Sequence, residues 1–257
     1  MIGVFDSGVG GLGILAEIRR LLPAADLIYL ADHAVAPYGP RDLAEVRERS
    51  ETVAGWLIER GCSIVTIACN TASAAALKSL RARFPRTHFV GMEPAVKPAT
   101  EITAAGRVGV VATAATFQGE LFATVVDRFA SGVTVFTAAC PSWVTLVEAG
   151  ITSGPEARAE VEACIGPLRD EGIDVLVLAC THYPRLMDVI SEVVGEAVAI
   201  VDPAPAVARQ TARLAASVAA AGAGRGRMEF CSTGDAGTLE SALRSLGLHG
   251  PVSLLPW

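Results

Sequence analysis

Short apolar runs alternate with longer amphipathic segments along the whole chain. The first apolar runs are bounded by Gly, Pro or polar turn residues: Ile2–Phe5, Leu27–Leu30, Ser63–Ala68 and His88–Gly91. Between the second and third runs, Leu43–Arg60 has apolar residues at a spacing of three or four, which is typical of a helix. Nearly continuous apolar strands separated by helices predict a parallel sheet covered on both faces. The sequence therefore predicts an α/β fold.

The second half of the chain repeats the first. The clearest match aligns Glu59–Thr71 (ERGCSIVTIACNT) with Asp170–His182 (DEGIDVLVLACTH), which places Cys69 and Cys180 at equivalent positions. Two more pairs of apolar runs match in the same order: Ile2–Asp6 with Val108–Ala112, and Leu27–Asp32 with Val133–Ala138. A repeat of this length is too long for a solenoid unit. It predicts a duplicated α/β domain whose two similar halves face each other.

The composition argues against several classes of protein. Hydrophobic residues make up 51% of the 257 residues and the mean hydropathy is +0.45, so the chain can bury a large core and is not disordered. The net charge is −6 without any Lys/Arg cluster, which argues against a nucleic-acid partner. The segment Pro203–Gly226 has Arg residues scattered among alanines, and we interpret it as a helix with a Gly-rich exit.

The sequence contains neither a membrane-spanning pattern nor a signal-peptide pattern. We therefore expect a cytoplasmic protein without membrane contact, whose six cysteines are free thiols. Their spacing includes no Cys-x-x-Cys pair, which argues against a metal site or a disulfide framework. Four of the cysteines have the context of core residues: Cys62, Cys140, Cys164 and Cys231. We expect the same structural role for the histidines that have no evident partner: His33, His88 and His249.

Polar residues gather in the turns that follow the predicted strands. In open parallel sheets, ligands bind beyond the carboxyl ends of the strands. The first turn, Asp6–Gly11 (DSGVGG), has glycines that allow a close backbone approach and expose amides at the start of a helix. It fits a dinucleotide-binding motif poorly, since no acidic residue is placed to bind a ribose. The second turn, from Asp32 to Pro40, holds Tyr38 between Pro and Gly, where it can cover a small ligand.

Two cysteines follow matching strands directly, and each stands at the start of a predicted helix. A thiol there lies at the positive end of the helix dipole, so we expect the pKa of Cys69 to be lowered from about 8.5 toward neutrality. Asn70 and Thr71 can cap this helix or bind a charged group of a substrate. One such cysteine is commonly a core residue. Two at equivalent positions of a duplicated fold should face each other across the cleft between the halves.

Two opposed thiols suit a reaction other than nucleophilic catalysis by a single cysteine. One thiolate can remove a proton from one face of a carbon, and the opposite thiol can return a proton to the other face. The stereocentre is then inverted. The substrate must have a weakly acidic C–H bond, and backbone amides or polar side chains must stabilise the developing carbanion. The polar turns can supply these groups.

The chain resembles the family of cofactor-independent glutamate racemases over nearly its whole length. The resemblance rests on these motifs: Phe5–Leu12 (FDSGVGGL), Ala31–Asp32 (AD), Pro37–Gly39 (PYG), Ala68–Ser73 (ACNTAS), Glu93–Pro98 (EPAVKP), Ala179–Pro184 (ACTHYP) and Val201–Ala204 (VDPA). It implies two flavodoxin-like domains with the active site in the cleft between them. Residues 1–96 and 207–257 would form domain one, and residues 97–206 would form the inserted domain two.

The resemblance also implies roles for particular residues. Cys69 and Cys180 would be the acid/base pair, with Asp6 assisting Cys69, His182 assisting Cys180 and Glu148 orienting that histidine. Asp32 matches a carboxylate near the substrate ammonium, and six other positions match substrate contacts: Ser7, Tyr38, Gly39, Asn70, Thr71 and Thr181. Neither a metal nor pyridoxal phosphate is implied, and these turns contain no lysine that could form a Schiff base.

The activity implied by the resemblance is the interconversion of L- and D-glutamate, which supplies D-glutamate for bacterial peptidoglycan. The implied assembly is a homodimer, and some members of the family also act on DNA gyrase. The chain departs from the family pattern at a few positions near the cleft wall: Ser142, Trp143, Thr145 and Arg185. Two alternatives stay open at this point, an aspartate racemase of the same superfamily and a non-catalytic regulatory module that kept the fold.

Overall fold

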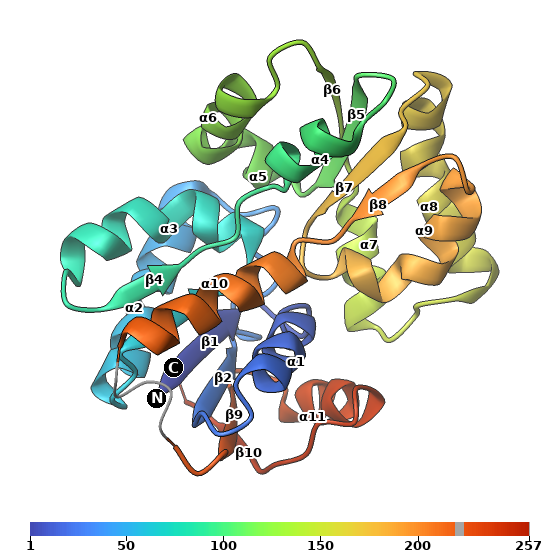
Figure 1. Ribbon diagram of the computed structural model, residues 1–257. Coiled ribbons are helices and arrows are strands. Elements are labelled where there is room, and N and C mark those ends of the chain that lie inside the picture. The colour runs from blue at the N-terminus through green and yellow to red at the C-terminus, as the bar shows by residue number, and fades with distance from the viewer. Residues whose placement is uncertain (219–223, 257) are drawn as a thin grey trace.

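The computed structural model describes residues 1–218 and 224–256, and its strands form two parallel sheets (Figure 1). The first sheet has the order β10-β9-β2-β1-β3-β4 and comprises β1 (Ile2–Asp6), β2 (Leu27–Ala31), β3 (Ile64–Ile67), β4 (His88–Val90), β9 (Met228–Ser232) and β10 (Val252–Leu254). The second has the order β6-β5-β7-β8 and comprises β5 (Arg107–Ala112), β6 (Thr134–Ala139), β7 (Val175–Ala179) and β8 (Ala199–Val201). The predicted α/β fold is confirmed.

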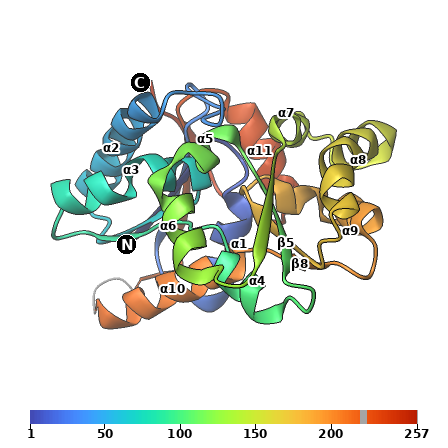
Figure 2. The same ribbon diagram turned by 90° about the horizontal axis from the view of Figure 1, so that it is seen from above.

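Helices cover both faces of each sheet. The structure has two halves, each built on one sheet. The helices of the first half, around the first sheet, are α1 (Leu12–Leu21), α2 (Leu43–Glu59), α3 (Asn70–Arg83), α10 (Ala204–Ser217) and α11 (Ala236–Ser245). Those of the second half, around the second sheet, are α4 (Val96–Ile102), α5 (Ala114–Gln118), α6 (Glu120–Phe129), α7 (Pro141–Glu148), α8 (Gly154–Asp170), the 3-10 helix η1 (Tyr183–Leu186) and α9 (Met187–Val194). Figure 2 shows α2 and α3 at one end of the molecule and α8 and α9 at the other.

Successive residues of the central strands point to opposite faces of their sheets and enter different cores. In β1, Ile2 and Val4 belong to the same apolar cluster as residues of α1 and α10, whereas Phe5 packs with residues of α2 and α3. In β7, Leu176 joins residues of α8 and α9, and Val175 joins residues of α4 and α6. This alternation explains why the strands read as continuous apolar runs, since both faces are buried.

The predicted duplication is visible in the strand order. The first sheet contains the sequence β2-β1-β3-β4, and the second repeats it as β6-β5-β7-β8. Strands of the first sheet come from residues 2–90 and 228–254, and those of the second come from residues 107–201. The exact domain boundaries near residues 97 and 206 stay a prediction.

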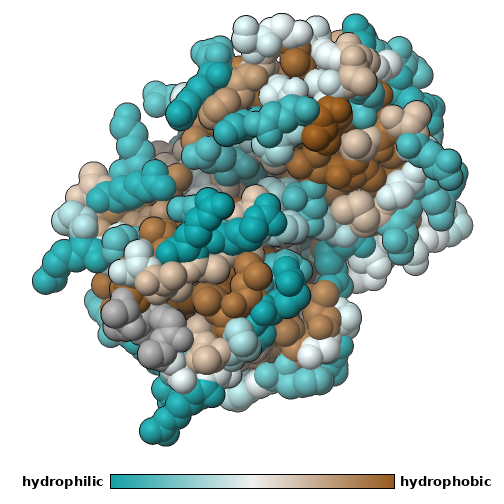
Figure 3. Space-filling view, in the orientation of Figure 1, coloured by the Kyte–Doolittle hydropathy of each residue, from teal (hydrophilic) through white to brown (hydrophobic). Residues whose placement is uncertain are grey.

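Most of the remaining predictions about helices and strands agree with the structure apart from short shifts, but Cys180 does not stand directly at the start of a helix, since η1 begins at Tyr183 and α9 at Met187. Strand β4 ends at Val90, one residue early, and β6 starts at Thr134, one residue late. The helix expected in Pro203–Gly226 is α10, while its Gly-rich exit includes residues 219–223, which lie outside the described residues. No helix in the described part of the chain is long and apolar enough to cross a membrane. On the face drawn in Figure 3, hydrophilic side chains are spread over both halves.

The prediction that all six cysteines are free thiols is wrong for one pair. Cys140 and Cys164 form a disulfide whose Cα atoms lie 6.0 Å apart. Cys140 precedes the first turn of α7 and Cys164 lies on α8, and the packing of these two helices brings the residues together, which no spacing rule reveals. Cys62 and Cys231 are free and buried, as predicted. Burial raises the pKa of Cys62 to about 12 and that of Cys231 to about 11.

Candidate active site

The turns after five strands, three from the first sheet and two from the second, meet at one small pocket. Most of the predicted site residues line it: Ser7, Tyr38, Gly39, Cys69, Asn70, Thr71, Cys180, Thr181 and His182. Pro37, Thr113 and Val144 complete the lining. Asp6, Asp32 and Glu148 are not part of the lining. The cavity volume is about 10 Å³, close to the space that one water molecule needs.

Cys69 ends up in an environment that disfavours its thiolate. It lies at the N-cap of α3, where its Sγ accepts a hydrogen bond from the amide of Ala72 at 3.4 Å. Burial nevertheless raises the pKa of Cys69 well above its ordinary value, and the nearby Asp6 carboxylate raises it further. The predicted lowering by the helix N-terminus is therefore wrong, because the loss of hydration outweighs one amide contact. Cys69 is held as a thiol.

Cys180 has a basic partner, His182, whereas the neighbour of Cys69 is acidic. The Sγ of Cys180 lies 3.9 Å from Nδ1 of His182, and Nε2 of the same ring lies 2.6 Å from Oε1 of Glu148. Burial alone would lower the pKa of His182, but its hydrogen bonds to Cys180 and Glu148 raise that pKa well above the ordinary value. The ring is therefore an imidazolium. A positive charge therefore lies beside Cys180, whereas a carboxylate lies near Cys69.

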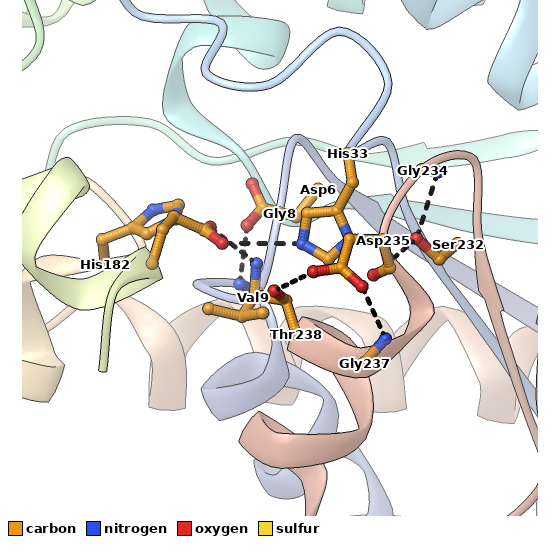
Figure 4. Close-up of polar contacts among 12 residues, drawn as sticks. Asp6, Gly8, Val9, His33, His182, Ser232, Gly234, Asp235, Gly237 and Thr238 are labelled. Atoms are coloured by element: carbon orange, nitrogen blue, oxygen red, sulfur yellow. Dashed lines mark hydrogen bonds and ion pairs between the residues drawn. The ribbon is translucent and has the colours of Figure 1, made fainter.

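Glu148 is a half-buried anion that two histidines contact. Burial acts to raise its pKa, but the contacts with His182 and His33 outweigh burial and hold the pKa below its ordinary range. The amide of Val9 donates a further hydrogen bond to Oε1 at 3.0 Å. His33, which we expected to have no partner, has its Nε2 3.5 Å from Oε2 of this carboxylate, so that expectation is wrong. Figure 4 shows His33 and His182 on opposite sides of these contacts.

The glycines of the first turn allow the two halves to touch. A Cβ atom on Gly8 would lie 2.0 Å from Oε1 of Glu148, and one on Gly10 would lie 2.5 Å from both His182 Nδ1 and Thr181 Oγ1. No side chain fits at either position without displacing these groups. The same turn holds Asp6, whose Oδ2 accepts a hydrogen bond from the amide of Gly11 at 2.8 Å. Burial raises the pKa of Asp6 above its usual value.

Asp32 sits at the centre of a buried network behind the pocket. Arg49 donates to both of its oxygens, at 2.7 Å from Nε and 2.6 Å from a terminal nitrogen. Tyr38 and Thr233 donate their hydroxyls to the same carboxylate at 2.5 and 2.6 Å. Sequence reasoning missed Arg49. Its signal was a charged residue between Val46 and Val53 on the buried face of α2.

Hydroxyl and amide groups from both halves line the remaining wall. Thr71 lies 2.8 Å from Thr113, which in turn lies 2.9 Å from Thr116, measured between their Oγ1 atoms. Sequence reasoning missed Thr113, although it follows β5 as Ser7 follows β1. Both polar atoms of the Asn70 side chain are buried without a hydrogen-bond partner among the described residues. Buried amides are normally paired, so Asn70 is available to bind a polar ligand in the pocket.

The chain is similar to known racemases in sequence and in structure. Residues 3–211 match the model of the Asp/Glu/Hydantoin racemase family. A glutamate racemase from Pseudomonas paraeruginosa is 49% identical over 213 residues, which cover 83% of this chain and 80% of that protein. Glutamate racemase isoform RacE1 from Bacillus anthracis superposes with a TM-score of 0.87 at 31% identity, covering 99% of this chain and 97% of that one. Glutamate racemase from Francisella tularensis in complex with D-glutamate has a TM-score of 0.87 at 26% identity, covering 99% and 96%.

The close approach at Gly10 predicts that even a methyl group there disturbs the site. In Gly10→Ala the added carbon collides with the ring of His182, so we expect loss of racemase activity toward glutamate in a protein that still folds. Gly13→Ala is the matched control, because a Cβ at Gly13 meets nothing within 4 Å and alanine favours the helix by about 0.5–1 kcal/mol. Circular dichroism of the glutamate solution measures the activity. Equal activity of both variants would contradict the proposed packing.

Proposed function

The chain belongs to the Asp/Glu/Hydantoin racemase family, and we propose that it interconverts L- and D-glutamate by proton transfer between two cysteines on opposite faces of Cα. One observation carries this proposal: Cys69 and Cys180, which follow equivalent strands of a duplicated fold, line the same pocket. The relatives named glutamate racemase, one of them solved with D-glutamate, support glutamate over aspartate as the substrate.

The two thiols differ in a way that defines the starting state of the reaction. Cys180 faces the imidazolium of His182 and is ready to act as a base, whereas Cys69 beside Asp6 is a thiol and ready to act as an acid. In the proposed arrangement, which the family resemblance suggests, L-glutamate binds with its α-hydrogen toward Cys180. Cys180 then takes the α-proton, and the carbanion takes a proton from Cys69. A thiol forms at Cys180 and a thiolate remains at Cys69, which is the starting state for D-glutamate.

The groups around the thiols supply binding and charge stabilisation. We propose that Asn70, with its unpaired amide, holds a substrate carboxylate together with Thr71 and Thr181. Ser7 and Gly39 contribute to the same wall from the other turns. Asp32 acts on the substrate through Tyr38, because its own oxygens are already bonded to Arg49, Tyr38 and Thr233. Donors aimed at the developing negative charge lower the barrier to carbanion formation.

Substrate binding requires movement of the pocket walls. A glutamate molecule is much larger than a cavity of about 10 Å³. The walls come from both halves of the chain, so we propose that the halves separate to admit glutamate and close again around it. Closure excludes water from the thiolate and the carbanion.

The resemblance also suggests the setting in which this enzyme works. We propose a cytoplasmic homodimer that supplies D-glutamate for bacterial peptidoglycan, with DNA gyrase as a further proposed partner. Incubation of the pure protein with each enantiomer of glutamate and of aspartate, followed by circular dichroism, tests the proposed function. Rapid loss of optical activity with glutamate supports it, and loss with aspartate alone would support the aspartate alternative. No change with either would support a binding module.

The two-thiol proposal predicts that both cysteines are essential. Cys69→Ala and Cys180→Ala should each lower the racemisation rate by at least about 100-fold, because each removes an acid or base. We expect a cost in stability below the roughly 2–5 kcal/mol of a large core truncation, since the side chain removed is small. Cys62→Ala is the matched control, as a buried free cysteine outside the pocket. Full activity in either site variant would refute the assignment.

The same proposal predicts the origin of the proton in the product. In heavy water, D-glutamate formed from L-glutamate should contain deuterium at Cα from the earliest times, because Cys69 exchanges its hydrogen with solvent. Recovered L-glutamate should stay largely protiated at low conversion. Mass spectrometry of both enantiomers measures this. Early D-glutamate that retains much of the substrate hydrogen would indicate a single swinging base instead.

The Glu148–His182–Cys180 chain predicts an asymmetric effect of neutralising Glu148. Glu148→Gln removes the charge that stabilises the His182 imidazolium. The kcat from L-glutamate should therefore fall about 10- to 100-fold, and the kcat from D-glutamate should fall less. Because the equilibrium constant is one, kcat/KM must fall equally in both directions, and only kcat and KM can differ. Steady-state kinetics in both directions measure the effect. Symmetric changes in kcat would remove the case for this chain.

A further inference from the structure

The carboxylate of Glu148 lies between two histidines that come from different halves of the chain. His182 follows β7 and its Nε2 contacts Oε1, whereas His33 follows β2 and its Nε2 faces Oε2 (Figure 4). We propose that His33 is a positioning residue of the racemase reaction: its Nε2–H group holds the second oxygen of Glu148 so that the first stays aligned with His182. This inference rests on the proposed function and adds a residue to its Cys180 side.

The surroundings of His33 determine which ring nitrogen faces the carboxylate. Nδ1 lies 2.9 Å from Oγ of Ser232, so the other nitrogen, Nε2, is left for Glu148. Nε2 is buried and has no hydrogen-bond partner among the described residues, and Oε2 of Glu148 lies 3.5 Å away, within ion-pair distance. A bare nitrogen lone pair would repel that carboxylate, so Nε2 carries a hydrogen. The side chain is only 7% exposed, and the ring is therefore fixed in this orientation.

Ser232 anchors the far side of the ring. Its hydroxyl donates to the backbone oxygen of Asp235 at 3.3 Å and accepts from the amide of Gly234 at the same distance. The same hydroxyl lies 2.9 Å from Nδ1 of His33, so the ring is held from this side as well. Figure 4 shows this chain of contacts running from Asp235 through His33 toward His182.

Glu148 needs this second contact because it is the least enclosed member of the chain. Its side chain is 22% exposed, against 3% for His182. Without His33, water would solvate Oε2 and the carboxylate could rotate about its last bond. The 2.6 Å contact with His182 would then be lost part of the time, and with it the positive charge beside Cys180. A partner that fixes a neighbouring group in this way tunes that group, as the outer partners of metal-bound histidines do.

The contact also joins the two halves of the molecule. Glu148 is the last residue of α7 and belongs to the half built on the second sheet. Val9 and His33 follow β1 and β2, which are strands of the first sheet. Closing the halves around glutamate therefore brings His33 and the Val9 amide onto the carboxylate at the same moment. The Cys180 side becomes aligned only in the closed state, in which water is excluded.

A pair of polar substitutions separates this role from simple packing. His33→Gln can place an N–H group near the position of Nε2 and should keep kcat within about twofold of the unmodified protein. His33→Asn can still reach Ser232 but is too short to reach Glu148, and His33→Leu fills the space without any donor. We expect both to lower kcat from L-glutamate about five- to tenfold, and kcat from D-glutamate by less. His249→Leu is the control, because His249 is exposed and does not line the pocket.

A double variant tests whether His33 acts through Glu148. If it does, adding His33→Asn to Glu148→Gln should cause little further loss beyond Glu148→Gln alone. Equal activity of the Gln and Asn variants, or losses that multiply in the double variant, would overturn the inference. The proposed function is tested separately: if the unmodified protein racemises glutamate and Cys180→Ala does not, the function stands whatever the His33 variants do. Thermal unfolding of each variant shows that it is folded.

Discussion

The contact between Glu148 and His182 is the interaction on which the rest of the site depends. It fixes one histidine as a cation beside Cys180, and it does so with a carboxylate that is also bonded to the backbone of the opposite half. The Gly-rich turn must come close enough to donate that bond, which is why Gly8 and Gly10 have no room for a side chain. The carboxylate of Glu148 thus determines the charge beside Cys180 and also joins the two halves of the molecule.

A symmetric fold here carries an asymmetric pair of thiols. The strand order of the first sheet is repeated in the second, and the two cysteines follow equivalent strands. Their neighbours are opposite in charge: a carboxylate lies near Cys69 and an imidazolium lies beside Cys180. The proposed reaction needs one acid and one base at the start of each turnover, and the different surroundings of the two cysteines suit these two roles. The symmetry of the fold determines where the two cysteines lie, and the side chains around each cysteine determine the charge beside it.

Behind the pocket, buried charges are paired before any substrate arrives. Both oxygens of Asp32 accept hydrogen bonds from Arg49, and the Tyr38 hydroxyl donates to the same carboxylate, so this part of the wall is rigid. Asn70 differs, since its amide is buried and has no partner within the described part of the chain. The wall therefore combines fixed groups that shape the pocket with one polar group left for recognition, as expected of a preorganised site.

The sequence by itself determined the architecture and the place of the chemistry. Apolar runs and helical spacing are local, and an internal repeat is visible without coordinates, so the parallel sheets, the duplication and the equivalence of Cys69 and Cys180 could all be predicted. The tertiary structure alone decided the charge state of Cys69, where burial reversed the effect of the helix terminus. It also decided the partners of His33, Arg49 and Cys140. These depend on which residues far apart in the chain are packed together and shielded from water, and no local pattern contains that information.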